Sequence, residues 1–282
     1  MQFISSNFTL EESNVVVFGV PLGKNARKAL DELRRISQFV EPMDLDSDTN
    51  LLENIRVYDI GDVELDSFDR ITEQTKKILQ MNKTPLILGG NHLLSLFSLK
   101  AFNNVKLIVF DAHGDFKNSY EDEKIRDMDT VEGIDYNPKV NDATWLRRAA
   151  EFTKPENILL LGVRSCEEFE FNDLNESGIK FFTSRQMIEN KDAIAEAVKK
   201  FTENSNVYIS LDVDVFDPGI CPSVDMPEPD GIFFNDFRNA IKSVNGKVVG
   251  MDVCCLNPQG NSEISEFLIV KSVFEMIHET FK

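Results

Sequence analysis

The chain has 282 residues, of which 42% are hydrophobic and 28% charged, so it is long enough to bury one large core or two smaller ones. Its 30 basic and 48 acidic residues give a net charge of −18, which argues against nucleic-acid or anionic-membrane partners and favours cationic ligands. Most of these charges are expected simply to solvate the surface.

The amino-terminal residues 1–6 lack a basic segment followed by an apolar stretch, so no secretory signal is predicted. No apolar run approaches membrane-spanning length, and we expect a cytoplasmic protein. The four cysteines show no C-x-x-C spacing; they are Cys166, Cys221, Cys254 and Cys255. This pattern predicts neither a zinc ribbon nor a disulfide framework, and buried thiols are expected.

Strand and helix patterns alternate along the chain. Strands are predicted at residues 15–20, 55–60, 85–88, 105–110, 158–163, 179–182, 207–211 and 247–251. Helices are predicted at residues 25–39, 71–81, 185–201, 234–244 and 263–281, and one more from residue 93 onward. About eight strands in this order require right-handed crossovers and a mostly parallel sheet with helices on both faces. No linker or repeat divides the pattern, so residues 1–282 are expected to form a single α/β domain.

A closed barrel would fit the same number of strands. Two long polar segments, at residues 117–142 and 217–231, are more typical of active-site loops beside an open sheet. We therefore expect an open sheet.

A buried strand is predicted to end just before a cluster of potential ligands. Residues 106–110 are β-formers, and Asp111, His113 and Asp115 follow them. In open α/β sheets ligands bind outside the carboxyl ends of the strands, so these residues stand where a site is expected. Taken alone, the stretch is equally well explained as a solvated acidic turn.

A second strand of the same kind occupies residues 206–217. Its alternation is expected to place Ser210, Asp212 and Asp214 on one face. Carboxylates buried at a strand end need partners, and the chain offers no basic cluster nearby.

A third strand end reads Gly-Gly-Asn-His at residues 89–92 and precedes an apolar helix. A single histidine is more often a hydrogen-bonded structural residue than a ligand. However, two of the three histidines in the chain, His92 and His113, fall at strand ends, whereas His278 is expected at the surface.

Together the three strand ends supply four carboxylates and two imidazoles. Oxygen ligands with a few imidazoles suit Mn²⁺, and Zn²⁺, Fe²⁺ or Co²⁺ would also be accepted. Four carboxylate charges balance two divalent ions, and two ions about 3.5–4 Å apart can activate a shared water molecule.

These motifs resemble those of the ureohydrolases, the family of arginase, agmatinase and formiminoglutamase. The resemblance rests on residues 89–92, on Asp-Ala-His-Gly-Asp at 111–115 and on Ser-Leu-Asp-Val-Asp-Val-Phe-Asp-Pro at 210–218. Shorter matches extend it along the chain, at residues 19–21, 58–62, 162–165, 167–168, 250–253 and 257–258. It implies a three-layer α/β/α fold, two Mn²⁺ ions, and hydrolysis of a small cationic guanidino compound such as agmatine to urea and an amine.

The resemblance also implies the ligands of each metal. One ion would be held by His92, Asp111, Asp115 and Asp212. The other would be held by Asp111, His113, Asp212 and Asp214, so that Asp111 and Asp212 bridge the pair. Asp115 is expected to take part in catalysis as well, and the protein is expected to be a homotrimer or homohexamer.

The sequence departs from the family pattern in the substrate region. Cys255 stands where the family usually has a glutamate that receives the guanidinium, and Asp142 stands where it usually has a proton-shuttling histidine. The loops at residues 21–27 and 222–227 also differ from the usual glycine-rich ones. If the substrate is a guanidinium, we expect Asp142, Glu167 or Asp225 to hold the cation.

Three functions are therefore considered. The first is an agmatinase-like enzyme. The second is a hydrolase of another amidine or amide, of the formiminoglutamase type, because a neutral Cys255 does not demand a guanidinium. The third is a non-catalytic metal-binding homologue, which is disfavoured because six buried ligands are costly to keep without use.

Overall fold

An eight-stranded parallel sheet crosses the protein in the order β4-β1-β5-β10-β9-β6-β7-β8. Its strands are β1 (Val15–Val20), β4 (Val57–Asp62), β5 (Thr84–Gly89), β6 (Lys106–Phe110), β7 (Ile158–Val163), β8 (Lys180–Thr183), β9 (Asn206–Asp212) and β10 (Lys247–Cys254). The structure is a computed structural model that describes residues 1–4, 8–123, 126, 134–258 and 262–282. All residues of β1 and β7 are buried, because both faces of a parallel sheet are covered.

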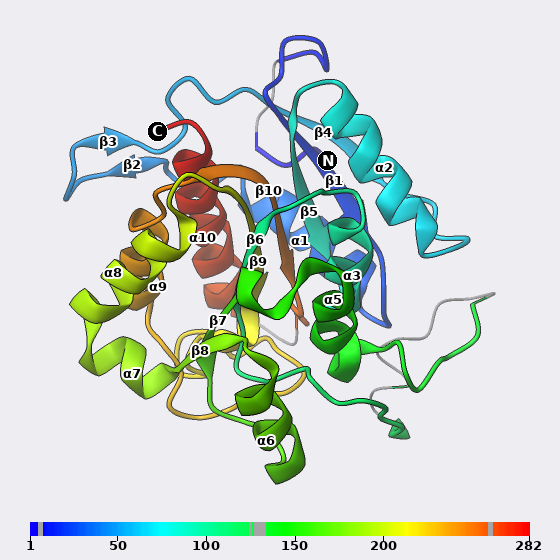
Figure 1. The fold of residues 1–282 in the computed structure, drawn as a ribbon. Coiled ribbons are helices and arrows are strands. Elements are labelled where there is room, and N and C mark those ends of the chain that lie inside the picture. The colour runs from blue at the N-terminus through cyan, green and yellow to red at the C-terminus, as the bar shows by residue number, and fades with distance from the viewer. Residues whose placement is uncertain (5–7, 124–125, 127–133, 259–261) are drawn as a thin grey trace.

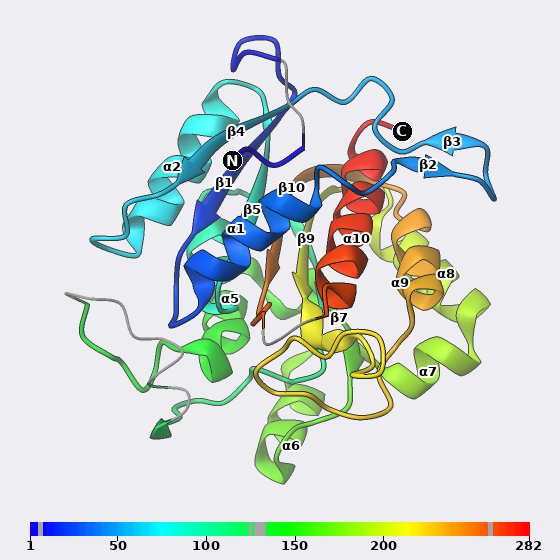
Figure 2. The same cartoon turned by 180° about the vertical axis from the view of Figure 1, so that it is seen from behind.

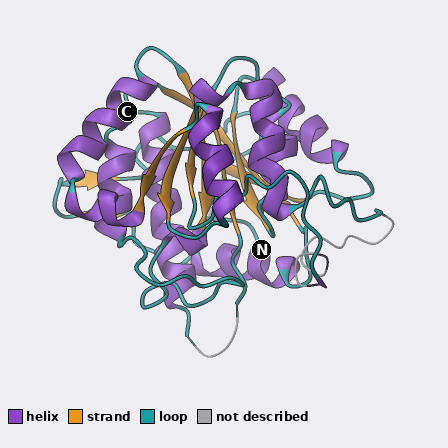
Figure 3. Cartoon of the chain, turned by 60° about the horizontal axis from the view of Figure 1, so that its bottom comes forward, coloured by secondary structure: helices purple, strands orange, loops and turns teal. Residues whose placement is uncertain are grey.

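Helices cover both faces of this sheet. Those in the described residues are α1 (Ala26–Ile36), α2 (Asp69–Gln80), α3 (Leu93–Leu99), α5 (Trp145–Thr153), α6 (Glu168–Ser177), α7 (Ser184–Glu189), α8 (Lys191–Thr202), α9 (Phe234–Lys242) and α10 (Ile264–Thr280). Helices α3 and α5 lie in front of the sheet in Figure 1, and α1 and α10 lie in front of it in the opposite view of Figure 2. Figure 3 shows the strands between the two helical layers. The three-layer α/β/α fold and the open sheet are thus confirmed.

The helices pack through apolar faces that the sequence spacing indicates. On α1 the buried aliphatic residues Ala29, Leu30, Leu33 and Ile36 recur every three or four positions, as an amphipathic helix requires. Helix α10 is buried on most of its surface, which fits its run of Leu, Ile, Val and Phe. Among the described residues no helix is both long and apolar enough to cross a bilayer.

Several local predictions were wrong. The helix expected at residues 185–201 is broken at Asn190, whose φ of −127° and ψ of 50° are not helical, so α7 and α8 are separate. Helices α5 and α6, and a short antiparallel hairpin of β2 (Met43–Asp44) and β3 (Thr49–Asn50), were not predicted. His278 is half-buried rather than at the surface, and Cys166 is exposed while the other cysteines are buried. The polar segment at 117–142 includes residues 124–125 and 127–133, which lie outside the described residues.

The register of the central strands brings their carboxyl ends to one edge. Phe110 of β6 pairs with Leu211 of β9, and Asp212 of β9 pairs with Cys254 of β10. Strand β5 lies on the far side of β10, where Leu88 pairs with Val253. The residues that follow β5, β6, β9 and β10 therefore meet at a single edge of the sheet.

A buried ion pair ties α1 to the end of β4. Arg34 is 4% exposed and donates to Asp59 at 2.8 Å and to Asp62 at 2.6 Å. Asp59 also accepts the backbone N–H groups of Phe3 and Gly61. A single side chain thus joins a helix, a strand and the amino-terminal segment.

We predict that Arg34→Leu lowers the free energy of unfolding by about 3–5 kcal/mol, because it leaves buried Asp59 without its counter-charge. Arg70→Leu is the matched control, since the Arg70–Asp66 pair is exposed and should contribute less than about 1 kcal/mol. Urea denaturation measures both. Equal losses for the two variants would contradict the role given to Arg34.

Candidate metal centre

Six potential ligands lie at the carboxyl ends of three strands, β5, β6 and β9. His92 immediately precedes α3, and Asp111 comes directly after β6. Asp212 is the last residue of β9. Asp214 is not on that strand as predicted, because the chain turns at Asp212 into a 3₁₀ turn, Val213–Val215. The turn is fixed by the Asp212 carboxylate, which accepts the N–H of Asp214 at 2.9 Å.

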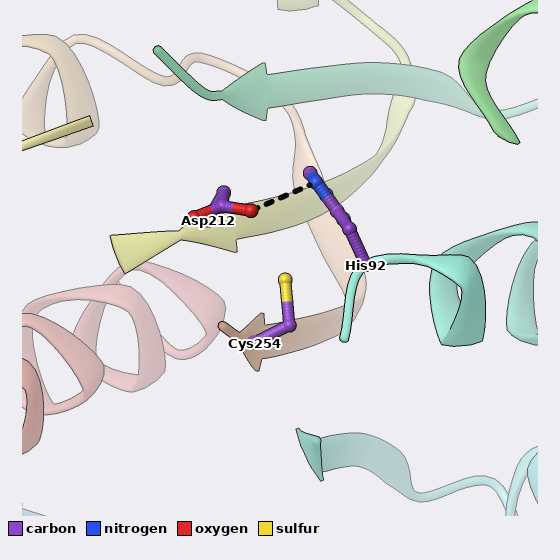
Figure 4. A group of neighbouring side chains, drawn as sticks. All are labelled: His92, Asp212 and Cys254. Carbon is purple, nitrogen blue, oxygen red and sulfur yellow. Dashed lines mark ion pairs between the residues drawn. The ribbon is translucent and has the colours of Figure 1, made fainter. Parts of the chain in front are cut away.

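The first cluster surrounds Nδ1 of His92. This nitrogen lies 3.0 Å from Oδ2 of Asp111, 3.3 Å from Oδ2 of Asp212 and 3.5 Å from Oδ2 of Asp115. Figure 4 shows His92 and Asp212 facing each other, with Cys254 beside them. Nδ1 is fully buried and has no hydrogen-bond partner among the described residues. A buried nitrogen facing three carboxylates is the arrangement expected around a cation.

The second cluster surrounds Nδ1 of His113. This nitrogen lies 2.9 Å from Oδ2 of Asp214 and 3.7 Å from Oδ1 of Asp111. Asp111 therefore presents one oxygen to each histidine. In the described residues the donor groups close enough to hold an ion together include both the Asp111–His113–Asp214 set and the His92–Asp111–Asp115 set.

A buried network beneath the first cluster holds the ring of His92. The carboxylate of Asp252 accepts the hydroxyls of Ser210 at 2.7 Å, Ser95 at 2.9 Å and Tyr208 at 2.6 Å. Nε2 of His92 lies 2.8 Å from the Ser210 hydroxyl, and when that hydroxyl donates to Asp252 its oxygen accepts from Nε2. In that arrangement Nδ1 keeps a lone pair directed at the aspartates, as a metal ligand requires.

Two residues that sequence reasoning missed hold the acidic loop. Trp145 donates from Nε1 to Asp115 at 2.8 Å, and its ring lies 4.3 Å from that of His92. Glu170 accepts the N–H of Phe116 at 2.8 Å. Asp115 itself has a φ of +45°, an unusual conformation for a residue with a side chain. The only sequence feature that could have drawn attention to Trp145 is that it is the single tryptophan of the chain.

Asp142 makes a structural contact that the sequence did not predict. One of its oxygens accepts the backbone N–H of His92 at 2.7 Å, and the residue is buried. Asp142 therefore positions the start of α3 as well as lining the cavity described next. Its assignment to proton transfer or cation binding stays a prediction.

An acidic cavity of about 260 Å³ opens above both clusters. Its walls include the remaining predicted substrate residues, Glu167, Asp225 and Cys255. They also include three residues that were not predicted, Cys166, Glu170 and Glu228. Lys117 also lines it, but its ammonium pairs with Glu167 at 2.7 Å. The excess of carboxylates in the wall favours a cationic ligand.

Cys255 lies in the cavity wall next to the first cluster. It is 9% exposed, has a φ of +67°, and donates its N–H to the carbonyl of Gly90 at 2.5 Å. Asp225 accepts a hydrogen bond from Asn257 at 2.5 Å, and Glu228 accepts one from Ser165 at 2.9 Å. Glu228 Oε1 also lies 3.8 Å from Nε2 of His113.

The pKa values follow from crowding of these groups. Burial, together with the charges of neighbouring aspartates, raises the pKa of Asp111 well above its usual range and that of Asp212 to about 6. Burial alone would lower the pKa of His113, but the carboxylates of Asp214 and Asp111 raise it to about 11. Without a cation the carboxylates repel one another, so the residues fit divalent ions in both charge and donor type.

Comparison with known proteins agrees with this architecture. The sequence model of the arginase family matches residues 13–278. The chain belongs to the arginase family. The family resemblance expected from the sequence is thereby confirmed, and the protein is a hydrolase of the ureohydrolase type.

Similar members of the arginase family span nearly the whole chain. The agmatinase of Bacillus anthracis is 29% identical and aligns with 98% of this chain and 94% of its own. The N(1)-aminopropylagmatine ureohydrolase of Thermococcus kodakarensis is 30% identical over 86% of this chain and 82% of its own. The crystal structure of the agmatine ureohydrolase of Thermoplasma volcanium superposes with a TM-score of 0.83 at 27% identity, covering 99% and 94% of the two chains.

We predict that the protein loaded with Mn²⁺ holds two ions per chain and that Asp111→Asn loses both, because this carboxylate faces both histidines. Asp173→Asn is the control, since Asp173 pairs with Arg147 away from the clusters. Metal analysis after desalting measures the ratio. Retention of one full equivalent by Asp111→Asn would show that the carboxylate is not shared.

The metal-free protein should lose stability as the pH rises from 7 to 10. The pKa of His113 is about 11 in the folded protein against an ordinary 6.5, so its stabilising charge is complete below about 6.5 and is lost as the pH passes 11. The decline is up to about 1.4 kcal/mol per pH unit. His113→Gln should flatten this part of the profile in thermal unfolding, and an unchanged slope would refute the assignment.

Proposed function

We propose that this protein hydrolyses a small cationic guanidino compound of the agmatine type to urea and an amine, with two divalent ions, Mn²⁺ being the expected metal. The observation that carries the proposal is the pair of His–Asp clusters that share Asp111 at the base of an acidic cavity. The names of similar proteins support the substrate class, since several are agmatinases.

The six predicted ligands would divide as the resemblance to the ureohydrolases implies. The first ion would take His92, Asp115 and the two shared carboxylates, and the second would take His113, Asp214 and the same pair. Asp212 faces His92 with one oxygen, which supports its place at the first ion, and its other oxygen accepts from the N–H of Asp214. The ions, when bound, supply Lewis acidity and lower the pKa of water in the site.

The chain's own residues would orient the substrate and handle protons. Asp115 is held by Trp145 in the first cluster and lines the cavity, where a carboxylate can receive a proton from the attacking water. Asp225 and Glu228 line the cavity wall and can bind cationic nitrogen by charge-assisted hydrogen bonds. Glu167 is a weaker candidate, because Lys117 already neutralises it.

Cys255 favours a second candidate function. A neutral thiol in the cavity wall is a poor acceptor for a guanidinium, so an amidine or amide of the formiminoglutamate type is the alternative substrate. Urea release from agmatine, arginine and guanidinobutyrate with Mn²⁺, measured beside ammonia or formamide release from formiminoglutamate, separates the two. Turnover of none of them by the metal-loaded protein would support a non-catalytic role.

We predict that the parent protein hydrolyses agmatine weakly and that Cys255→Glu raises kcat/KM. A carboxylate at this position would form charge-assisted hydrogen bonds, each contributing about 1.5–3 kcal/mol, which corresponds to a gain of about 10- to 100-fold. Steady-state urea production measures both proteins. Cys166→Glu is the matched control, because it adds the same charge to the same cavity wall at another cysteine and should give no comparable gain.

The opposite result would also be informative. If the parent already reaches about 10⁴ M⁻¹s⁻¹ with agmatine and Cys255→Glu lowers that value, another carboxylate holds the cation. Asp225→Asn and Glu228→Gln would then identify which one, by the larger rise in KM.

A further inference from the structure

A thiol lies against the first cluster of the metal centre. Cys254 is the last residue of β10 and pairs in register with Asp212 of β9. Its sulfur, a carboxylate oxygen of Asp212 and a ring nitrogen of His92 all lie within 4.8 Å of one another. Figure 4 shows the sulfur directed toward the space between the other two side chains. All three residues are buried.

The contacts of this sulfur are weak or lie within the cluster itself. It lies 3.6 Å from the carbonyl of Leu211, and its other hydrogen-bond contacts are with the adjacent thiol of Cys255 and with His92. Nδ1 of His92, fully buried, has no hydrogen-bond partner among the described residues. A thiol at this position adds a soft ligand beside an imidazole and a carboxylate.

We propose that Cys254 binds the ion of the first cluster through its sulfur, together with His92 and Asp212. The inference rests on the metal centre of the proposed function and deepens it. As the sulfur–metal bond forms, the S–H bond breaks and its proton leaves to solvent, while no atom changes oxidation state. A thiolate ligand shifts the preference of this cluster from Mn²⁺ toward thiophilic ions, with Zn²⁺ and Co²⁺ first among them.

The neighbouring cysteine is expected to behave differently. Cys255 lines the cavity, where substrate enters, whereas Cys254 does not line it and lies beneath the cluster. The two thiols are adjacent in the sequence and both buried, so Cys255 is the matched control for Cys254.

Cobalt gives a readout that does not depend on activity. The intact metal-free protein is titrated with Co²⁺ and its absorption spectrum recorded. Binding to the carboxylates and imidazoles produces the weak visible bands of Co²⁺, and a sulfur ligand adds an intense charge-transfer band in the near ultraviolet. We expect both signals in the parent protein, loss of the ultraviolet band alone in Cys254→Val, and retention of both in Cys255→Val.

Metal competition provides a second measurement on the same variants. The affinity for Zn²⁺ relative to Mn²⁺ should fall by about tenfold or more in Cys254→Val and stay unchanged in Cys255→Val. Removal of a residue that only hydrogen-bonds to a metal ligand already lowers metal affinity by about 10- to 100-fold, and removal of a ligand should lower it at least as much. Thermal unfolding of the metal-free proteins verifies that both variants fold.

Each outcome decides the inference. Visible Co²⁺ bands without the ultraviolet band in the parent would overturn it and leave the proposed function standing. An ultraviolet band that disappears with Cys255→Val but survives Cys254→Val would overturn it too, because the ligand would then be the thiol of the cavity wall. Absence of any bound Co²⁺ would overturn both the inference and the metal centre on which it rests.

Discussion

The structure depends on the mutual repulsion of carboxylates that parallel strands bring together. Asp111 and Asp212 stand at the ends of adjacent strands because the register of β6 and β9 aligns them. Asp115 and Asp214 follow within a few residues, and burial intensifies the repulsion among the four. Two imidazoles at the same place offset this repulsion, and on our proposal two bound cations do so as well.

A buried group of hydrogen-bonded residues, centred on Asp252, lies beneath the four carboxylates. Asp252 accepts three hydroxyl protons and is itself buried, so a fifth carboxylate remains without a positively charged neighbour in direct contact among the described side chains. Its bond to Ser210 connects it to Nε2 of His92. The ring of one candidate ligand is therefore held from the neighbouring strands β10 and β9, by residues that do not line the cavity.

The open parallel sheet and the gathering of the six candidate ligands at one of its edges could be predicted from the sequence, whereas the residues that support those ligands could not. Apolar runs such as residues 106–110 are followed directly by acidic residues, so the local sequence predicts both the strand and the candidate ligands at its carboxyl end. Helices and loops far along the chain supply Trp145, Glu170 and Glu228. No local sequence pattern predicts that these residues lie beside the candidate ligands. The capping box of Thr183 and Gln186 marks the start of α7 but does not indicate the break at Asn190. The turn that takes Asp214 off its strand depends on a side-chain bond that alternation does not predict.

The bond between Asp142 and the backbone of His92 limits how the substrate region can change. A histidine placed at 142 would remove the carboxylate that accepts the N–H at the start of α3, so the ligand that follows would lose its anchor. A substitution at 142 therefore keeps the start of α3 in place only if the new side chain puts an acceptor atom at the same point. The two departures from the family pattern differ in this respect: position 142 is tied to its scaffold through its side chain, whereas the described backbone bond of position 255 runs through its own N–H to Gly90.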